Sequence, residues 1–190
     1  GISEILLYLT GLSQKFLEDN LKIEVKGPGK GSILEVKEEK GLGTTIDIIL
    51  YDGMLKKTDE IIFGALDGAK KTKVRAIMKP RLPGEKGEGK YKYVDKIYAA
   101  SGAKIFAPEL GSAVSGSPVM VVDDNEQELI ETISKQMKTI LFESGDVGVI
   151  VKSDTLGSAE AVIKMLKEKN IPINKINIGP VNKKDVLDAE

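Results

Sequence analysis

The sequence predicts a mostly β protein that ends in an α/β unit, and three stretches of the chain carry that prediction. Residues 1–22 form an amphipathic segment, residues 23–123 a run of short β-branched segments, and residues 147–190 an alternation of strand-like and helix-like segments. A helical stretch over residues 124–146 joins the last two. The composition, with 41% hydrophobic and 30% charged residues in 190, supplies enough apolar material for such domains.

The first 22 residues predict a helix whose apolar stripe needs a partner. Its apolar residues recur three and four positions apart: Ile5, Leu6, Leu9, Leu12, Phe16 and Leu17. Ser3 is placed to cap the first turn. One helix cannot bury its own stripe, and the flexible stretch GPGKGS follows it. We therefore expect this helix to belong to something that precedes Gly1.

Seven segments between Gly31 and Asp123 predict strands: SILEVKE, TTIDIILY, EIIFGAL, KTKVRAIMK, YVDKIYAA, KIFAPEL and PVMVVD. In TTIDIILY, alternation places Ile46, Ile48 and Leu50 on one face. Strands that follow one another without helices favour a closed β-barrel, because closure removes exposed sheet edges.

Two Asp-Gly pairs in this region predict hairpin turns. Asp52-Gly53 is expected to join the two strands of the stretch Gly41–Gly64, and Asp67-Gly68 the next pair. Glycine supplies the positive φ angle that tight hairpins need.

The last part of the chain predicts a parallel β-α-β unit. VGVIVKS, AEAVIKMLKEKN, IPINKINIG and VNKKDVLDAE have the patterns of strand, helix, strand and the start of a helix. Before them, Leu129, Ile130, Ile133 and Met137 form the stripe of the linking helix. Two parallel strands cannot bury both sheet faces, so we expect either that the rest of this domain is missing or that the unit docks elsewhere.

Composition excludes several kinds of chemistry. The chain has neither Cys nor His, which removes thiol nucleophiles, His-assisted serine chemistry and the usual zinc ligands. Carboxylate, lysine and backbone chemistry remain, and among them we expect no catalytic residue and no metal site. The apolar runs are too short to cross a bilayer, which predicts a cytoplasmic protein without a membrane partner.

Four short motifs are better explained by structure than by chemistry. Gly84–Tyr91 has P-loop spacing, but Tyr91 stands where Ser or Thr must bind magnesium. Asn182–Asp185 spells N-K-x-D, yet Asn182 is better placed as a helix cap. Ser101–Lys104 matches S-x-x-K without its companion motifs, which favours a turn between strands. In Thr155–Ser158, Ser158 is expected to cap the next helix.

A local surplus of positive charge is the remaining signal. Its candidate RNA contacts are Lys70, Lys71, Lys73, Lys79, Arg81, Lys86, Lys90 and Lys92. Tyr91 and Tyr93 lie among them and could stack on bases. Lysines bind RNA phosphates, but they also protect exposed sheet edges, so both explanations stay open.

A family resemblance accounts for the order of the segments. SILEVKEEKGLGTTIDIILYDGMLKKTDEIIFG, KVRAIMKP, AASGAKIFAPEL and AVSGSPVMVV resemble the second domain of archaeal and eukaryotic translation initiation factor five-B, a relative of bacterial initiation factor two. VGVIVKSDTLGSAEAVIKMLK and INIGPVNKKDV resemble the start of its third domain. Residues 1–22 are similar to the last helix of its GTPase domain.

The resemblance implies part of a ribosome-dependent GTPase that promotes subunit joining and supports initiator methionyl-tRNA. Its second domain is an elongation-factor-like β-barrel that rests on small-subunit rRNA, and its third an α/β/α sandwich that relays movement. The GTP and magnesium sites would precede Gly1 and the tRNA-binding domain would follow Glu190, so this part is expected to be a monomer without enzymatic activity or cofactor. Around RLPGEKGEGKYKY the chain has more Gly and Lys than the family pattern.

Two other functions stay open. One is a free-standing barrel that binds single-stranded nucleic acid, with Tyr91 and Tyr93 stacking on bases. The other is an enzyme that uses Ser153, Asp154 and Thr155 at a strand end, where α/β sites commonly lie.

Overall fold

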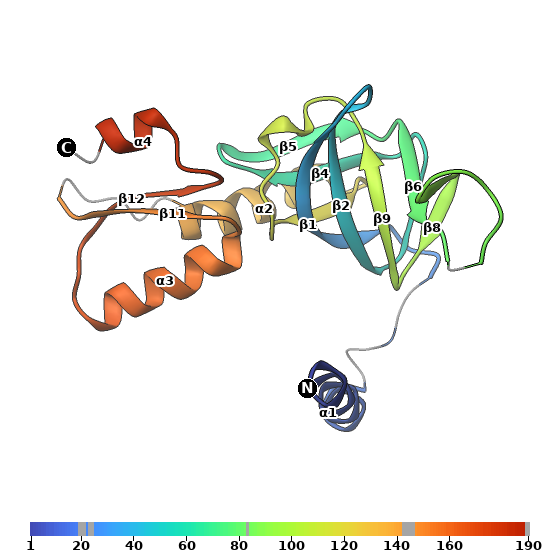
Figure 1. Ribbon diagram of the computed structural model, residues 1–190, viewed down its shortest axis with the longest axis horizontal. Coiled ribbons are helices and arrows are strands. Elements are labelled where there is room, and N and C mark those ends of the chain that lie inside the picture. The colour runs from blue at the N-terminus through green and yellow to red at the C-terminus, as the bar shows by residue number, and fades with distance from the viewer. Residues whose placement is uncertain (19–21, 23–24, 83, 142–146, 189–190) are drawn as a thin grey trace.

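The computed structural model describes the chain except residues 19–21, 23–24, 83, 142–146 and 189–190. Helix α1 (Ile2–Phe16) precedes a large antiparallel sheet, and helix α2 (Glu126–Leu141) leads from the sheet to a β-α-β unit. In Figure 1 this unit lies at one end of the molecule and strands β6 and β8 lie at the other.

The described residues of the β region form ten strands, rather than the seven expected: β1 (Lys30–Glu39), β2 (Gly43–Asp52), β3 (Met54–Lys56), β4 (Glu60–Ala65), β5 (Gly68–Lys73), β6 (Ala76–Pro80), β7 (Tyr91–Val94), β8 (Lys96–Tyr98), β9 (Ser101–Phe106) and β10 (Pro118–Val121). Eight form one sheet in the order β5-β4-β10-β1-β2-β9-β6-β7, while β3 pairs with β8. A short 3-10 helix, Leu110–Ser112, lies between β9 and β10.

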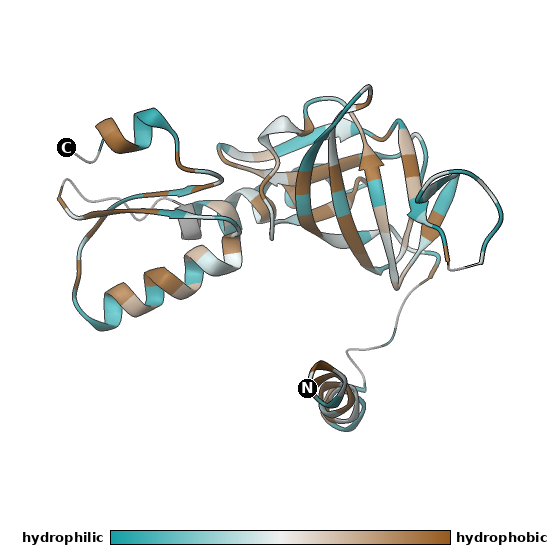
Figure 2. Cartoon of the chain, viewed as in Figure 1, coloured by the Kyte–Doolittle hydropathy of each residue, from teal (hydrophilic) through white to brown (hydrophobic). Residues whose placement is uncertain are grey.

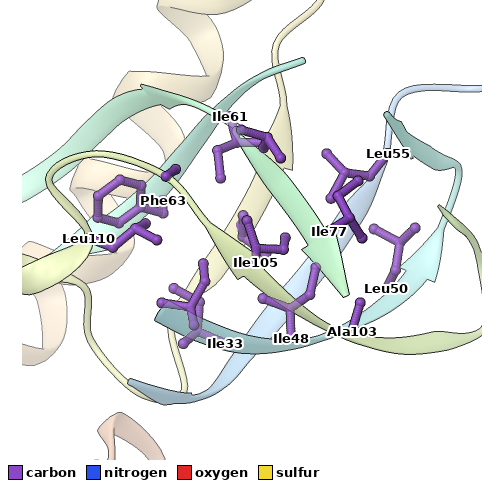
Figure 3. Close-up of a cluster of buried hydrophobic side chains, with 14 of the residues drawn as sticks. Ile33, Ile48, Leu50, Leu55, Ile61, Phe63, Ile77, Ala103, Ile105 and Leu110 are labelled. Carbon is purple, nitrogen blue, oxygen red and sulfur yellow. The ribbon is translucent and has the colours of Figure 1, made fainter. Parts of the chain in front are cut away.

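The strands curl around one apolar core (Figure 3), but the expected closure of the barrel is not found. Within the described residues no ladder joins the two outermost strands, β5 and β7. Helix α2 packs on the β5 edge instead, where the Ala69 N–H donates to Ser134 Oγ at 3.2 Å. A polar side chain therefore satisfies an edge group that a neighbouring strand would otherwise have paired.

The period-two prediction for β2 is confirmed. Ile46, Ile48 and Leu50 are at most 1% exposed and point into the core, where Phe63 and Ile105 meet them.

The Asp52-Gly53 hairpin prediction is wrong, although Gly53 does have a positive φ of 70°. Strand β3 follows Gly53 but pairs with β8. Strand β2 instead pairs with β1 on one side and β9 on the other. The stretch Gly41–Gly64 therefore holds three strands. The Asp67-Gly68 prediction is confirmed, because β4 and β5 form a tight hairpin in which Ala65 pairs with Gly68.

Helix α1 has no buried residue, and Figure 2 shows apolar segments along it. Its first residue is Ile2 and Gly1 stands at the N-cap, so Ser3 lies inside the first turn and makes no cap bond. Among the described residues, no helix has the length and hydropathy that a membrane span requires.

The predicted β-α-β unit is confirmed. Strands β11 (Val149–Ser153) and β12 (Ile173–Ile178) are parallel, with α3 (Leu156–Glu168) between them and α4 (Lys183–Leu187) after them.

Helix α2 packs against both the large sheet and the β-α-β unit, because all three contribute residues to a second apolar core. Ile62 of the large sheet, Met137 of α2 and Leu156 of α3 are all buried in this core. The Leu156 N–H also donates to Ser115 O at 2.9 Å. The helix expected over 124–146 begins at Glu126, and the part of that prediction covering 142–146 lies outside the described residues.

Candidate nucleic-acid interface

The eight basic candidates lie on two groups of elements. Lys70, Lys71 and Lys73 lie on β5, and the other five lie on β6, β7 and the loop between them. These strands are at opposite ends of the sheet order.

The β5 lysines are largely neutralised. Lys70 pairs with Asp67 at 3.2 Å, and Lys71 with Glu126 at 2.9 Å and Glu60 at 3.3 Å. Hydrogen bonds to Glu126 and then Glu60 raise the pKa of the Lys71 ammonium. Lys73 stands opposite Glu60 in the ladder. This strand therefore presents little free positive charge, and its lysines fit edge protection and helix docking.

The β6–β7 hairpin, residues 76–94, is less neutralised by ion pairs than β5 is. Lys79 stands directly opposite Lys92, and the Arg81 N–H donates to Lys90 O at 2.9 Å, so cations face each other across the hairpin. One carboxylate, Glu85, forms an ion pair with Lys92.

Three side-chain hydrogen bonds order the hairpin loop. Arg81 Nη1 donates to Lys86 O at 3.0 Å. The pKa of Glu85 is lowered, first by its bond from Lys92 and then by the Leu82 N–H. The P-loop-like stretch Gly84–Tyr91 is thus a hairpin connection that runs into a strand, with no helix N-terminus to hold a phosphate.

Both candidate stacking tyrosines are on the surface of β7. Tyr91 is 39% exposed and Tyr93 67% exposed. The Lys104 ammonium lies 5.4 Å from the centre of the Tyr91 ring.

Lys104 is a residue that the sequence did not single out for this site. It is 3% exposed and bonds Glu39 and Asp47, each at 3.1 Å. Burial lowers the pKa of its ammonium, but the bonds to Glu39 and Asp47 outweigh burial and raise it. The prediction that Ser101–Lys104 forms a turn is wrong, because these residues lie within β9. The pairing of β9 with β2 and with β6 brings Lys104 to its partners. Spacing within the sequence does not reveal this arrangement.

The carboxyl ends of β11 and β12 are occupied by helix caps. Thr155, not Ser158 as expected, is the N-cap of α3, and its side chain accepts from the Ser158 N–H at 3.2 Å. Asn182 caps α4 in a reciprocal capping box with Asp185, which confirms the structural explanation of N-K-x-D.

Stability at low pH is expected to depend on Asp185. The pKa of its carboxyl is lowered, first by a 2.8 Å bond from Lys152 and then by the Asn182 N–H. A carboxyl with a lowered folded-state pKa stabilises the fold above its ordinary value of about 3.9, and this contribution is lost as the pH falls through the folded value. Melting temperatures measured by circular dichroism should therefore drop as the medium is acidified below about pH 4. Asp185→Asn should flatten that drop, whereas the exposed-site control Asp124→Asn should reproduce the parent profile.

Among the described residues, no group of three His, Cys, Asp or Glu side chains is arranged to hold a metal ion. The described surface instead offers a basic hairpin, exposed tyrosines and capped helix termini.

Comparison with known proteins identifies the class. The family model "Translation-initiation factor 2" matches residues 121–190. The probable translation initiation factor IF-2 of Thermococcus sibiricus is 49% identical over the whole chain, which covers 32% of that relative. The Pyrococcus horikoshii IF-2 is 50% identical, again over the whole chain, which covers 18% of it.

A solved structure agrees with these sequences. GDP-bound aIF5B from Aeropyrum pernix matches 99% of this chain with a TM-score of 0.80 and 40% identity, and the match covers 32% of that protein. The fold and the sequence thus define part of a translation initiation factor. The chain belongs to the IF-2/aIF5B family, and it spans about a third or less of the length of these relatives.

Proposed function

We propose that this chain docks an IF-2/aIF5B-type factor on small-subunit ribosomal RNA through its β6–β7 hairpin. The observation that carries the proposal is the positive charge of that hairpin, where Lys79 faces Lys92, Arg81 lies across from Lys90, and Glu85 pairs with Lys92. Phosphate contacts of this kind position a partner without reading its sequence.

We further propose how the chain divides among the domains of such a factor. Residues 1–22 would be the last helix of a GTPase domain, 23–123 the elongation-factor-like barrel, 124–146 the linking helix and 147–190 the start of an α/β/α domain. The shared core around α2 supports a role in passing movement from the second domain to the third. In the whole factor, GTP hydrolysis with magnesium would belong to the first domain and initiator tRNA binding to the last, and the factor would act as a cytoplasmic monomer.

The binding proposal predicts an unequal effect of two matched triple variants. Lys79, Lys86 and Lys90 take part in no ion pair within the described part of the chain, so we expect their combined replacement by Gln to weaken binding to small-subunit rRNA about tenfold. The slope of log affinity against log salt should fall by about 2, because each lost contact on single-stranded RNA removes about 0.7. Fluorescence anisotropy over a salt series measures both quantities.

The control removes the same charge from β5. Replacing Lys70, Lys71 and Lys73 together by Gln should change affinity by less than about threefold, since these lysines already face carboxylates. Equal losses in the two variants would contradict the assignment to the hairpin. Binding of a fluorescent GTP analogue at micromolar concentration would contradict the proposed division into domains.

A further inference from the structure

Exposed apolar side chains gather in a cleft between the large sheet and the β-α-β unit. The cleft has a volume of about 1170 Å³. Leu34 of β1, Leu66 in the turn between β4 and β5, Tyr91 of β7 and Val181 before α4 all line it. These four side chains are between 39% and 67% exposed. Apolar surface gathered in this way marks a site where another molecule binds.

The two walls of the cleft are fixed relative to each other. Val114 and Ser115 line the wall on the side of the sheet, and the Ser115 carbonyl accepts a hydrogen bond from the Leu156 N–H at 2.9 Å. A Cβ atom at Gly116, the next residue, would lie 3.1 Å from Leu156 Cβ, so the backbone there already contacts α3. A preformed cleft loses little conformational entropy when it binds a partner.

Carboxylates outnumber ammonium groups in this cleft. Glu35, Asp47 and Asp154 line it, and Lys152 is the one cation among the described residues of its lining. Lys152 is largely buried and pairs with Asp185 at 2.8 Å, which neutralises its charge. The cleft is therefore electronegative, so it attracts cations and repels the phosphates of RNA.

The three carboxylates differ in how far they are already neutralised. Asp47 pairs with Lys104 at 3.1 Å, and Glu35 also has a lysine partner, at 2.7 Å. Asp154 is exposed and forms no ion pair within the described part of the chain. A hydrogen bond from the Ser158 side chain lowers the pKa of its carboxyl, which is therefore ionised at neutral pH. Asp154 is thus the carboxylate best placed to bind a cation of a partner.

Size and charge together select the class of partner. Sites for small ligands have volumes of about 300–1,000 Å³, so this cleft has room for a segment of polypeptide. RNA does not match the carboxylates. Helix α1 does not match them either, because its apolar stripe carries one glutamate and one lysine, Glu4 and Lys15, and so has no net charge. A segment that combines lysine or arginine with apolar side chains matches both features of the cleft.

We propose that the cleft binds a basic segment of a protein partner. The apolar side chains of the segment lie against Leu34, Tyr91 and Val181, and a lysine or arginine forms an ion pair with Asp154. The proposal goes beyond docking on RNA and does not depend on it, because the cations of the β6–β7 hairpin do not line the cleft. The chain then has two binding surfaces of opposite charge, a basic one for RNA and an acidic one for protein.

Two labelled peptides that differ only in charge test this proposal. One contains Lys, Leu and Ser, and the other has Glu at every Lys position. In anisotropy titrations of the whole chain, the Lys peptide should bind at least about tenfold more tightly, because like charges facing each other across an interface are unfavourable. Asp154→Lys should weaken binding of the Lys peptide and strengthen binding of the Glu peptide.

Single substitutions with matched controls locate the site. Asp154→Asn should weaken binding of the Lys peptide about two- to fivefold, whereas Asp124→Asn, at an exposed residue outside the cleft, should leave it unchanged. Leu34→Ser should weaken binding about three- to tenfold through lost apolar contact, whereas Leu82→Ser, in the hairpin loop, should not. All four positions are exposed, so these variants should fold like the parent.

Several results would overturn the cleft as a peptide site. Equal affinities for the two peptides, equal effects of Asp154→Asn and Asp124→Asn, or failure of the Lys peptide to bind at millimolar concentration would each do so. In nuclear magnetic resonance spectra, binding should shift the amide signals of Leu34 and Val181. Shifts confined to α1 would mean that the peptide adheres to the apolar stripe of that helix instead.

Two further measurements separate this proposal from docking on RNA. The triple variant at Lys79, Lys86 and Lys90 should bind the Lys peptide as the parent does, whatever its affinity for RNA. Oligouridylate should not displace the Lys peptide from the parent chain. Displacement would assign the cleft to RNA and overturn its assignment to a protein partner.

Discussion

Replacing Phe63 with alanine is expected to lower the free energy of unfolding by roughly 3–5 kcal/mol. Phe63 lies on β4 and is fully buried, and Figure 3 shows it beside Leu110 in the sheet core. The variant loses the transfer energy of the ring and leaves a cavity that a curled sheet, held by ladders on both sides of β4, can fill only in part. Urea denaturation followed by circular dichroism measures the change.

Phe16→Ala makes the same chemical change on α1, where the ring is 69% exposed. Surface substitutions usually change stability by less than about 0.5 kcal/mol, and we expect that here. Comparable losses in the two variants would show that α1 is packed against the rest of the chain in solution, contrary to its arrangement in Figure 1.

Sequence patterns predicted the features that depend on neighbouring residues. The alternation in β2 identified its buried face, and the parallel β-α-β unit followed from the order of its segments. The cap at Asn182 was also predictable, because a capping box depends on residues three apart. Each of these features is set by neighbours in the sequence.

Features set by distant pairing were not predictable. Gly53 has the positive φ expected of a turn, but the choice of β8 rather than β2 as the partner of β3 depends on residues 40 to 44 positions away. The β5 edge of the sheet is covered by α2 and not by another strand. Ser134 of α2, which lies outside the β region in the sequence, accepts the hydrogen bond from the Ala69 N–H there.

The candidate site shows the same limit. The surplus of lysine was visible in the sequence, but its division between β5 and the β6–β7 hairpin was not. Neither was the neutralisation of Lys71 by Glu126, which lies 55 residues away. Lys104 joined the site because register brings β9 beside β2 and β6, a relation that no local spacing encodes.

The second large effect is expected at Gly64, where the sheet meets α2. A Cβ atom at this position would lie 2.6 Å from Ser117 Cβ and 2.7 Å from Met137 Sδ. Met137 can move its flexible side chain, but Ser117 is fixed, because its hydroxyl donates to Gly64 O at 3.1 Å. Gly64→Ala should therefore separate β4 from α2 and cost roughly 1–3 kcal/mol, the usual range for overpacking.

Gly157→Ala, in the first turn of α3, tests whether this cost comes from packing. No atom lies within 4 Å of a Cβ at that position, so alanine should stabilise the helix by up to about 1 kcal/mol. The two substitutions are chemically identical and should change the urea midpoint in opposite directions. Because Met137 belongs to the core shared by the sheet, α2 and the β-α-β unit, Gly64→Ala should also increase hydrogen exchange in β11 and α3. A loss of protection confined to β4 would instead mean that the sheet and the β-α-β unit are not coupled through α2.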